Sequence, residues 1–247
     1  FIDLTISDTD VVIQKYDMGE NVAFGTGTGT SNRFGQRKEI KSVDKQVPYE
    51  EPLAIHEGVD NFTVNDNAEE VIQERAALHA EAWVEQMNGF LSKALSDAAH
   101  KTLTGKLTEE DVVKTFNEAS KIFVNNKVSK DVARVAYVTS DVYNFIMDAK
   151  LVSTGKGSTV NIDDNEYPKF KGFILDELAD EYFQKGENII FAADNVGVAG
   201  VGIEIYRMLD SEDFAGVAIQ SAGKFGKYIP EKNQKAVVKA KLAAVTA

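Results

Sequence analysis

One proline-free stretch, residues 67–103, constrains this chain more than any other feature of its sequence. Its apolar residues recur every three or four positions, which places them on one face of an α-helix, whereas a strand would need steps of two. This apolar stripe consists of Ile72, Ala76, Ala80, Trp83, Met87, Phe90, Leu91, Ala94 and Ala98. At about 1.5 Å per residue the helix would be roughly 55 Å long, about three times the mean helix of a globular protein.

Both ends of this predicted helix carry sequence signals. Asp66 can cap the first turn, with Glu69 three residues later as its capping-box partner, and Gly105 follows as a C-terminal stop. Gly89 is the one poor helix former inside, because glycine lowers helix stability by about 1 kcal/mol relative to alanine. Two interpretations of Gly89 stay open: a position where a neighbouring element packs closely, or a point at which the helix bends.

Composition excludes several classes of protein. Of 247 residues, 43% are hydrophobic, which is enough for a sizeable core, and the net charge of −12 argues against a dedicated nucleic-acid binder. The chain has no cysteine, which excludes disulfide scaffolds, thiol catalysis and zinc sites built on thiolates. No apolar run is long enough to span a bilayer and no signal peptide is visible. Because the first residue is Phe1, we expect that an N-terminal piece has been removed or left out.

The region before the long helix has two parts. In residues 1–32, a strand-like run at 11–13 precedes a glycine-rich run that lacks the Gly-Lys-Ser/Thr ending of a phosphate loop, which favours a flexible or extended arm. Residues 33–66 partly alternate polar and apolar positions around Pro48-Tyr49-Glu50-Glu51-Pro52, which predicts a long β-hairpin with its tip at the prolines.

The two arms of the predicted hairpin differ in charge. The first arm is basic and the second carries only acidic charges. The basic residues are Arg33, Arg37, Lys38, Lys41 and Lys45, against Glu39 and Asp44, and the acidic ones are Glu50, Glu51, Glu57 and Asp60. A two-stranded ribbon of about 50 Å has no core of its own and is marginal in isolation. Two interpretations remain: a solvated hairpin with cross-strand ion pairs, or an arm that lies across a neighbouring subunit.

The rest of the chain mixes helices and strands. Thr108 and Asp111 predict the capped start of a helix over 108–126 with one apolar face. Residues 135–139 read as a buried strand, 142–149 as a short helix and 153–165 as a polar surface loop. Further strands are predicted at 172–178, 188–192, 196–209, 216–220, 226–229 and 236–242. Six lysines between 224 and 241 predict a solvated face or one that pairs with acidic partners, and less readily an inner surface that touches nucleic acid.

No motif in the sequence points to catalysis. His56, His79 and His100 lack any metal-binding spacing, and no Gly-x-Ser-x-Gly elbow is present. Asp163-Asp164 lacks the pattern of a calcium loop. We therefore predict no catalytic residues, no cofactor and no metal site, and a protein that is not an enzyme.

The order of the predicted parts resembles the major capsid protein of tailed bacteriophages, with its Hong Kong 97-type fold. The resemblance covers nearly the whole chain and rests on the order and spacing of several segments. These segments are residues 57–66 leading into the helix, Phe170 to Phe173, Phe191 to Asn195, and Gly216 to Gln220. The fold class implied is α+β, with an N-arm, an extended β-hairpin loop, a long spine helix, and peripheral and axial domains.

The resemblance also implies a division of the chain. Residues 1–32 would be the N-terminal arm and 33–66 the extended loop. Residues 67–105 and 196–247 would form the peripheral domain with its spine helix, and 106–195 the axial domain. The expected assembly contacts in the extended loop are Arg37, Lys38, Lys41, Tyr49, Glu50 and Glu51, with Gly89 as the bend of the spine helix.

The function implied is self-assembly into pentamers and hexamers of an icosahedral shell around double-stranded DNA. The expected partners are further copies of the chain, a portal, a scaffolding protein and packaged DNA bound without sequence specificity, with no membrane. The expected location is the virion capsid, assembled in the cytoplasm of a bacterial host. Alternatives are an encapsulin-type compartment shell and, from another class, a soluble α/β ligand-binding protein or enzyme.

Overall fold

The computed structural model describes the chain in several stretches, and every structural statement below refers to them. The described residues are 1–3, 10–15, 24–25, 33–35, 39, 43–61, 68–129, 131–149, 168–213 and 215–244.

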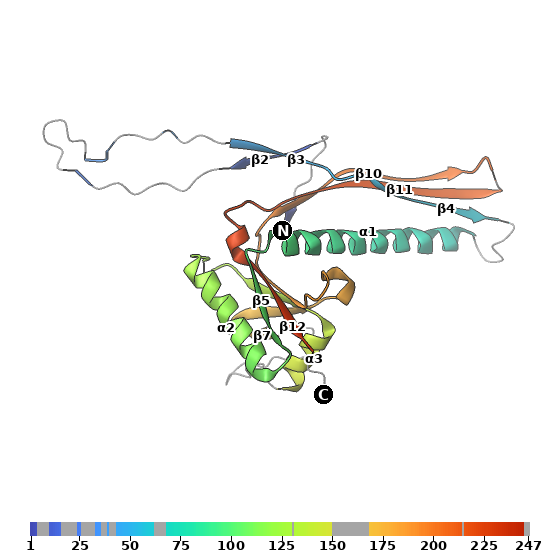
Figure 1. Ribbon diagram of the computed structural model, residues 1–247. Helices are drawn as coiled ribbons and strands as arrows, with labels where there is room; N and C mark the ends of the chain where they lie inside the picture. The colour runs from blue at the N-terminus through green and yellow to red at the C-terminus, as the bar shows by residue number, and fades with distance from the viewer. Residues whose placement is uncertain are drawn as a thin grey trace.

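One long helix and a four-stranded sheet form an elongated layer, which we call the α1 layer. Helix α1 (Ala68–Ala98) packs lengthwise on β11 (Gly216–Tyr228) and β4 (Leu53–Asp60) (Figure 1). The sheet order is β1-β10-β11-β4, where β1 (Ile2–Asp3) pairs in parallel with the start of β10 (Val198–Asp210). In chain order, β4 runs toward one end of this layer and α1 runs back along the sheet (Figure 1).

The predicted spine helix is present but shorter than expected. Helix α1 has 31 residues, about 46 Å at the usual rise per residue, and it ends at Ala98 rather than near Leu103. Residues Lys101–Lys106 instead form strand β5, which pairs in parallel with β12 (Val237–Ala243). Pairing with a strand far along the chain overrides the helical periodicity, so Gly105 lies in a strand and is no helix stop.

Most of the predicted stripe on α1 faces the sheet, with one exception. Ala94 is buried and the larger apolar members Ile72, Trp83, Met87 and Phe90 are half-buried, whereas Ala80 is exposed. The cap residue Asp66 lies outside the described residues, and the side chain of Glu69 is not described.

The second part of the molecule is a six-stranded sheet with helices, which we call the six-stranded unit. Its strand order is β5-β12-β9-β6-β8-β7, and it adjoins the C-terminal end of α1 (Figure 1). The remaining elements of the unit are α2 (Glu109–Asn125), β6 (Arg134–Val138), α3 (Ser140–Asp148), β7 (Lys169–Phe170), β8 (Phe173–Glu177), β9 (Ile189–Ala193) and the short turns η2 (Asp180–Tyr182) and η3 (Gln234–Ala236).

These elements confirm the mixed α+β class and most of the predicted boundaries. The predicted capped helix is α2, where the Thr108 side chain accepts a hydrogen bond from the backbone of Asp111. The two predicted strands at 216–220 and 226–229 are one continuous strand, β11. The loop predicted at 153–165 lies outside the described residues.

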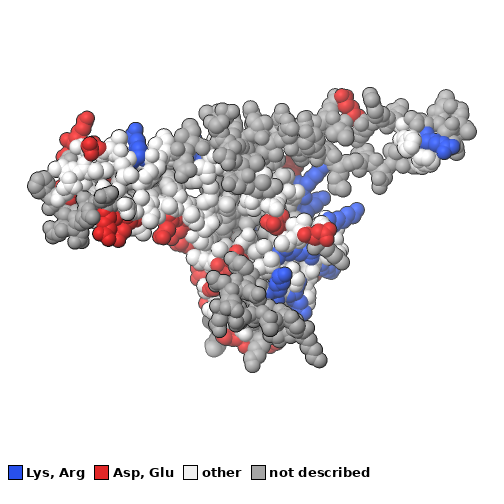
Figure 2. Space-filling model, turned by 180° about the vertical axis from the view of Figure 1, so that it is seen from behind, with Lys and Arg blue, Asp and Glu red and all other residues white. Residues whose placement is uncertain are grey.

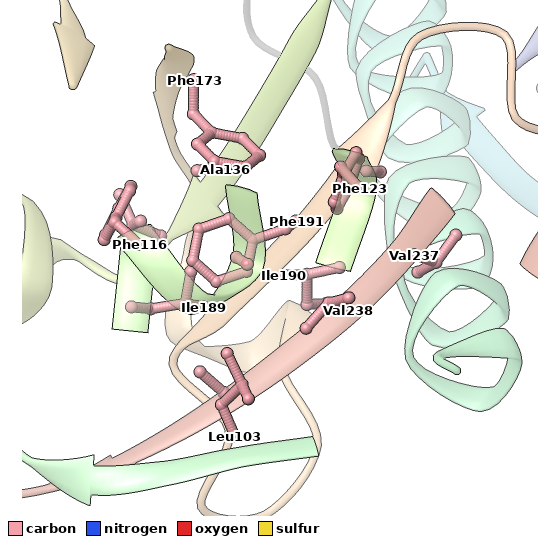
Figure 3. Close-up of a cluster of buried hydrophobic side chains, with 14 of the residues drawn as sticks. Leu103, Phe116, Phe123, Ala136, Phe173, Ile189, Ile190, Phe191, Val237 and Val238 are labelled. Atoms are coloured by element: carbon pink, nitrogen blue, oxygen red, sulfur yellow. The ribbon is translucent and has the colours of Figure 1, made fainter. Parts of the chain in front are cut away.

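Aromatic side chains form the centre of the core in the six-stranded unit. Phe116 on α2 is fully buried, and its ring lies 4.7 Å from that of Phe170 and 4.9 Å from that of Phe191, measured between centroids. Phe173 packs on Phe191 and Phe123, and Ile189, Ile190 and Val238 complete the cluster (Figure 3). Burial of this cluster stabilises the unit strongly, because aromatic rings bury large apolar areas.

The long hairpin predicted over residues 33–66 is wrong in its pairing. Strand β3 (Val43–Pro48) pairs with β2 (Asp10–Lys15), and β4 pairs with β11 instead of β3. The β2–β3 ribbon projects from one end of the molecule, away from α1 (Figure 1). Residues 1–32 are therefore not only an arm, because they contribute one strand to this ribbon and one to the α1 layer.

The C-terminal strands also divide differently from the prediction. Strands β10 and β11 belong to the α1 layer. Strand β12 lies in the middle of the six-stranded sheet, between β5 and β9. Its fully buried Val237, Val238 and Ala240 belong to the aromatic core of that unit, which explains why the strand is placed there.

No helix among the residues described is long and apolar enough to cross a membrane.

Candidate assembly interface

Aromatic and ionic contacts join α1 to the four-stranded sheet. The ring centroids of Trp83 and Phe225 lie 5.3 Å apart, and those of Phe90 and Phe225 lie 6.4 Å apart. The Lys227 Nζ atom is 3.5 Å from the centre of the Phe90 ring and 3.2 Å from Oε1 of Glu50. These contacts hold α1, β11 and the segment around Glu50 together.

The structure describes only some of the predicted assembly residues of the extended loop. Arg37, Lys38 and Lys41 lie outside the described residues. Tyr49 is half-buried, while Glu50 and Glu51 are exposed. Besides its ion pair with Lys227, Glu50 donates its backbone N–H to the carbonyl of Phe225 at 2.9 Å, so it anchors the segment within its own subunit.

A polar cluster fixes the outer half of α1 on β4 and β11. Glu57 on β4 accepts a hydrogen bond from Nε of Arg75 at 2.7 Å and is also paired with the other end of that guanidinium group. The buried His79 ring lies between Oε2 of Glu57 and Oγ of Ser221, at 3.2 Å from each. Among the described residues its Nε2 atom makes no well-aligned hydrogen bond, so Arg75 is the main partner of the Glu57 carboxylate.

The carboxylate of Glu57 makes the stability of this cluster depend on pH. The hydrogen bond from Arg75 lowers the pKa of Glu57 below its ordinary value of 4.5, and His79 acts in the same direction, while burial opposes both. Because the pKa is lower in the folded state, the stabilisation is fully present above pH 4.5 and is lost as pH falls through the folded pKa.

We therefore expect Glu57→Gln to lower the free energy of unfolding at pH 7, and the difference from wild type to shrink steadily below pH 4.5. Denaturant unfolding at several pH values measures this difference. The exposed Glu51→Gln is the matched control and should change stability little at any pH. A difference for Glu57→Gln that stays constant down to pH 3, about one unit below the usual range of carboxyl pKa values, would contradict this assignment.

A second polar cluster joins the C-terminal end of α1 to the six-stranded unit. The Glu187 side chain is 1% exposed, and its Oε1 lies 2.8 Å from Nζ of Lys239 on β12. Ser96 on α1 donates its hydroxyl to Oε2 of Glu187 at 2.6 Å and accepts a hydrogen bond from Lys239 at 3.1 Å. Lys241 lies 3.9 Å from the same carboxylate. These contacts couple the spine helix to the neighbouring sheet through buried charges.

The residues just before Glu187 also contact α1. Ser92 donates its hydroxyl to the carbonyl of Tyr182 at 2.6 Å, and Gln184 donates to Asp97 at 2.7 Å. The Tyr182 ring also covers Gly89: a Cβ atom built there would lie 3.5 Å from the ring. The structure thus places a neighbouring element against Gly89 at ordinary van der Waals distance, and the bend remains a proposal.

We expect Gly89→Ala to raise the stability of the subunit by about 0.5 to 1 kcal/mol, because alanine favours the helix and the added methyl group fits against Tyr182. Thermal or denaturant unfolding measures the change. Ala82→Gly, also on the helix interior, is the reverse control and should lower stability by a similar amount. A destabilised Gly89→Ala variant would show that the contact is tighter than this distance implies.

Charge is distributed unevenly over the surface. Acidic residues gather on the α1 layer, and Lys and Arg gather on one side of the six-stranded unit (Figure 2). Glu74, Glu81 and Glu85 on α1 are exposed, and no ion pair joins them to any other described residue. An acidic spine helix disfavours tight binding of a polyphosphate on this face.

The buried ion pairs were not visible in the sequence. Three of the six lysines between 224 and 241 lie in ion pairs within the subunit: Lys227, Lys239 and Lys241. The available signal was the alternation in β12, because Lys239 and Lys241 fall on one face of the strand, but Glu187 comes from a turn that no pattern linked to it. Among the described residues, no group of three or more His, Asp or Glu side chains could hold a metal ion.

Comparisons by sequence find no match: neither a protein-family model nor a curated protein is recognisably similar. Comparison by structure finds bacteriophage capsids. The mature capsid of bacteriophage PhiM1 superposes with a TM-score of 0.70 at 10% identity, over 99% of this chain and 86% of the other. The capsid of Ralstonia phage GP4 gives 0.68 at 11% identity, over 99% and 87%.

A virus-like particle from Pyrococcus furiosus is also similar, with a TM-score of 0.58 at 13% identity over 97% of this chain and 89% of that one. The chain therefore has the fold of phage capsid subunits along nearly its whole length, in agreement with the Hong Kong 97-type fold that the order of its parts resembles. At these identities the likeness establishes the fold.

Proposed function

We propose that this chain is a major capsid protein that assembles into the icosahedral shell of a tailed phage. The observation that carries the proposal is the superposition of the whole chain on phage capsid subunits, at TM-scores near 0.7. The role is structural rather than enzymatic, and it places the protein in the virion capsid. Assembly in the host cytoplasm, packaged double-stranded DNA, a portal and a scaffolding protein belong to the same proposal.

Two physical features support an assembling subunit. The β2–β3 ribbon has two strands and no core, and such a ribbon is marginally stable unless it lies on another surface. The α1 layer is elongated and leaves one long side of α1 exposed. The ribbon is costly in a monomer, and both features are useful in a shell, where neighbouring copies can lie against them.

Within this proposal, the α1 layer is the peripheral domain and the six-stranded unit is the axial domain that meets its copies around five- and six-fold axes. Residues 16–42 with the β2–β3 ribbon form the extended part that contacts neighbouring subunits. Arg37, Lys38, Lys41, Tyr49 and Glu51 are its proposed contact residues, and Gly89 is the proposed bend of the spine helix. Glu50 acts by anchoring the segment.

An encapsulin-type compartment shell is the alternative that shares this fold. The phage capsids superpose better than the virus-like particle, at about 0.7 against 0.58, which favours the phage capsid. A soluble ligand-binding protein or enzyme would need a site with converging polar groups, and the structure supports an assembly subunit better.

Expression of the chain, alone and with a scaffolding protein from the same gene cluster, tests the proposal. Size exclusion and negative-stain microscopy should show hollow shells, rings or tubes. A monomer that stays unassembled under both conditions would contradict it. Shells that purify with a bound enzyme instead of DNA would favour the encapsulin alternative.

A further inference from the structure

Two exposed phenylalanines lie together at the far end of the extended part. The rings of Phe24 and Phe34 meet edge to face at 5.5 Å, although 66% of Phe24 and 78% of Phe34 are exposed. The backbone N–H of Gly25 donates to the carbonyl of Arg33 at 3.0 Å, which holds the two short segments side by side. The Arg33 guanidinium lies 5.8 Å from the centre of the Phe24 ring. The tip therefore presents an apolar pair beside a cation.

An apolar cleft opens between α1 and the sheet, and we call it the Trp83 cleft. It is about 200 Å³ in volume and is lined by Trp83, Val84, Met87, Val201, Gly223 and Phe225. The exposed fraction of Val84 at its mouth is 59%. The exposed Glu81 lies three residues before Val84 on α1, so it adds negative charge beside the opening.

The tip and the cleft are complementary in size, chemistry and charge. A closed apolar cavity of about 150 Å³ accommodates a benzene ring, so a cleft of this volume can take a phenylalanine side chain. Trp83 and Phe225 offer ring faces for an aromatic partner. Arg33 at the tip matches Glu81 at the mouth, and charge complementarity of this kind favours one orientation of docking.

The tip cannot be the occupant of its own cleft in this arrangement. Residues 24–25 and 33–35 lie at the far end of the extension, beyond β2 and β3, and α1 lies under the opposite half of the molecule (Figure 1). A heterologous contact between two different surfaces of one chain joins each copy to the next and generates rings or lattices.

We propose that the Phe24–Phe34 pair of one copy docks into the Trp83 cleft of a second copy. The inference rests on the proposed self-assembly and assigns it a specific contact. Arg33 lies against Glu81 of the second copy, and the apolar rings exclude water from Trp83. This contact forms only on assembly.

Disulfide trapping tests the contact directly, because the chain has no cysteine of its own. A chain carrying Phe34→Cys together with Val84→Cys is assembled and oxidised, and covalent ladders are counted on denaturing gels. A disulfide needs the two Cβ atoms to lie about 3.5 to 4.5 Å apart, so we expect a cross-linked fraction about tenfold above that of the control. The control pairs Phe34→Cys with Val124→Cys, since Val124 is 51% exposed but lies on α2, outside the cleft.

A second readout uses Trp83, the one tryptophan of the chain. Its emission should shift to shorter wavelength when the wild-type subunit assembles, and the shift should be absent from Phe24→Ala/Phe34→Ala. The concentration needed for assembly of that variant should rise about tenfold or more, as for loss of a buried aromatic contact between subunits. Val124→Ala is the matched control and should assemble like wild type.

The outcomes separate this inference from the proposed function. Shells that form normally without the Phe34–Val84 ladder, or with equal ladders in the Val124 control, overturn the docking contact and leave the capsid function standing. If the emission of Trp83 does not change when wild-type shells form, the docking contact is likewise overturned and the capsid function still stands. Absence of any assembly from the wild-type chain contradicts the proposed function itself.

Discussion

Replacing residues 16–42 by an Asn-Gly turn is expected to leave a folded subunit that no longer forms shells. Lys15 and Val43 are paired neighbours in the β2–β3 ribbon, and Asn-Gly is the preferred two-residue connection between paired antiparallel strands. The change therefore closes the ribbon where its strands already meet. It removes the tip and the basic segment that we expect to reach a neighbouring copy, while β3, Glu50 and the α1 layer keep their contacts.

Two measurements check this variant. Its unfolding free energy should stay within about 1 kcal/mol of the wild-type subunit, since none of the removed residues that the structure describes belongs to the core. Negative-stain microscopy should show dispersed subunits or small oligomers. Val124→Ala on α2, outside the extended part, is a control that should assemble, because one exposed side chain contributes little. Normal shells from the shortened variant would refute an assembly role for residues 16–42.

Lys239→Met is expected to destabilise the subunit by about 3 kcal/mol, because it leaves the carboxylate of Glu187 buried without its closest cation. Lys241 at 3.9 Å and the Ser96 hydroxyl compensate only in part. Since the cluster joins α1 to β12, the loss should also loosen the contact between the α1 layer and the six-stranded unit. Denaturant unfolding measures the stability, and amide hydrogen exchange over residues 92–98 measures the loosening.

A double variant separates the ion pair from packing at the same place. Glu187→Leu together with Lys239→Met removes both charges and keeps similar volumes, and such replacements are often neutral or stabilising. We expect the double variant to be more stable than Lys239→Met alone. Lys235→Met, at an exposed lysine on the same unit, should change stability by less than about 0.5 kcal/mol. Equal destabilisation by the single and double variants would show that packing, not charge, is lost.

Local patterns in the sequence predicted much of the fold correctly. The periodicity around Trp83 and Phe90 predicts α1, and the Thr108 cap with the apolar face through Phe116 and Phe123 predicts α2. Short alternating runs predict most of the strands. These signals succeed because helix periodicity, capping and strand alternation act over a few residues and do not depend on distant partners.

Strand partners were not predictable in the same way. The alternation at Leu53 and Ile55 indicates a strand, but nothing in it states that β11 rather than β3 lies alongside. The run Lys101–Lys106 is predicted to contain the end and the stop of the helix, and it is instead a strand that pairs with β12, more than 130 residues later. Pairing is settled by burial of both faces in the finished sheet, which is a property of the whole chain.

The candidate interface was only partly predictable. Exposed charge in the extended segment was visible in the sequence, whereas the Trp83 cleft depends on Phe225 and Val201 arriving from two other strands. The cluster of Glu187, Lys239 and Ser96 was not predictable either, because these residues come from three separate parts of the chain.

Electron cryomicroscopy of the particles formed by the purified chain tests the central claim most directly. The account predicts closed shells whose reconstruction shows five-fold and six-fold clusters, with α1 and its sheet fitting the density as one layer and the extended part crossing onto a neighbouring copy. A chain that remains monomeric, or particles whose subunit density cannot hold this fold, would contradict the capsid function.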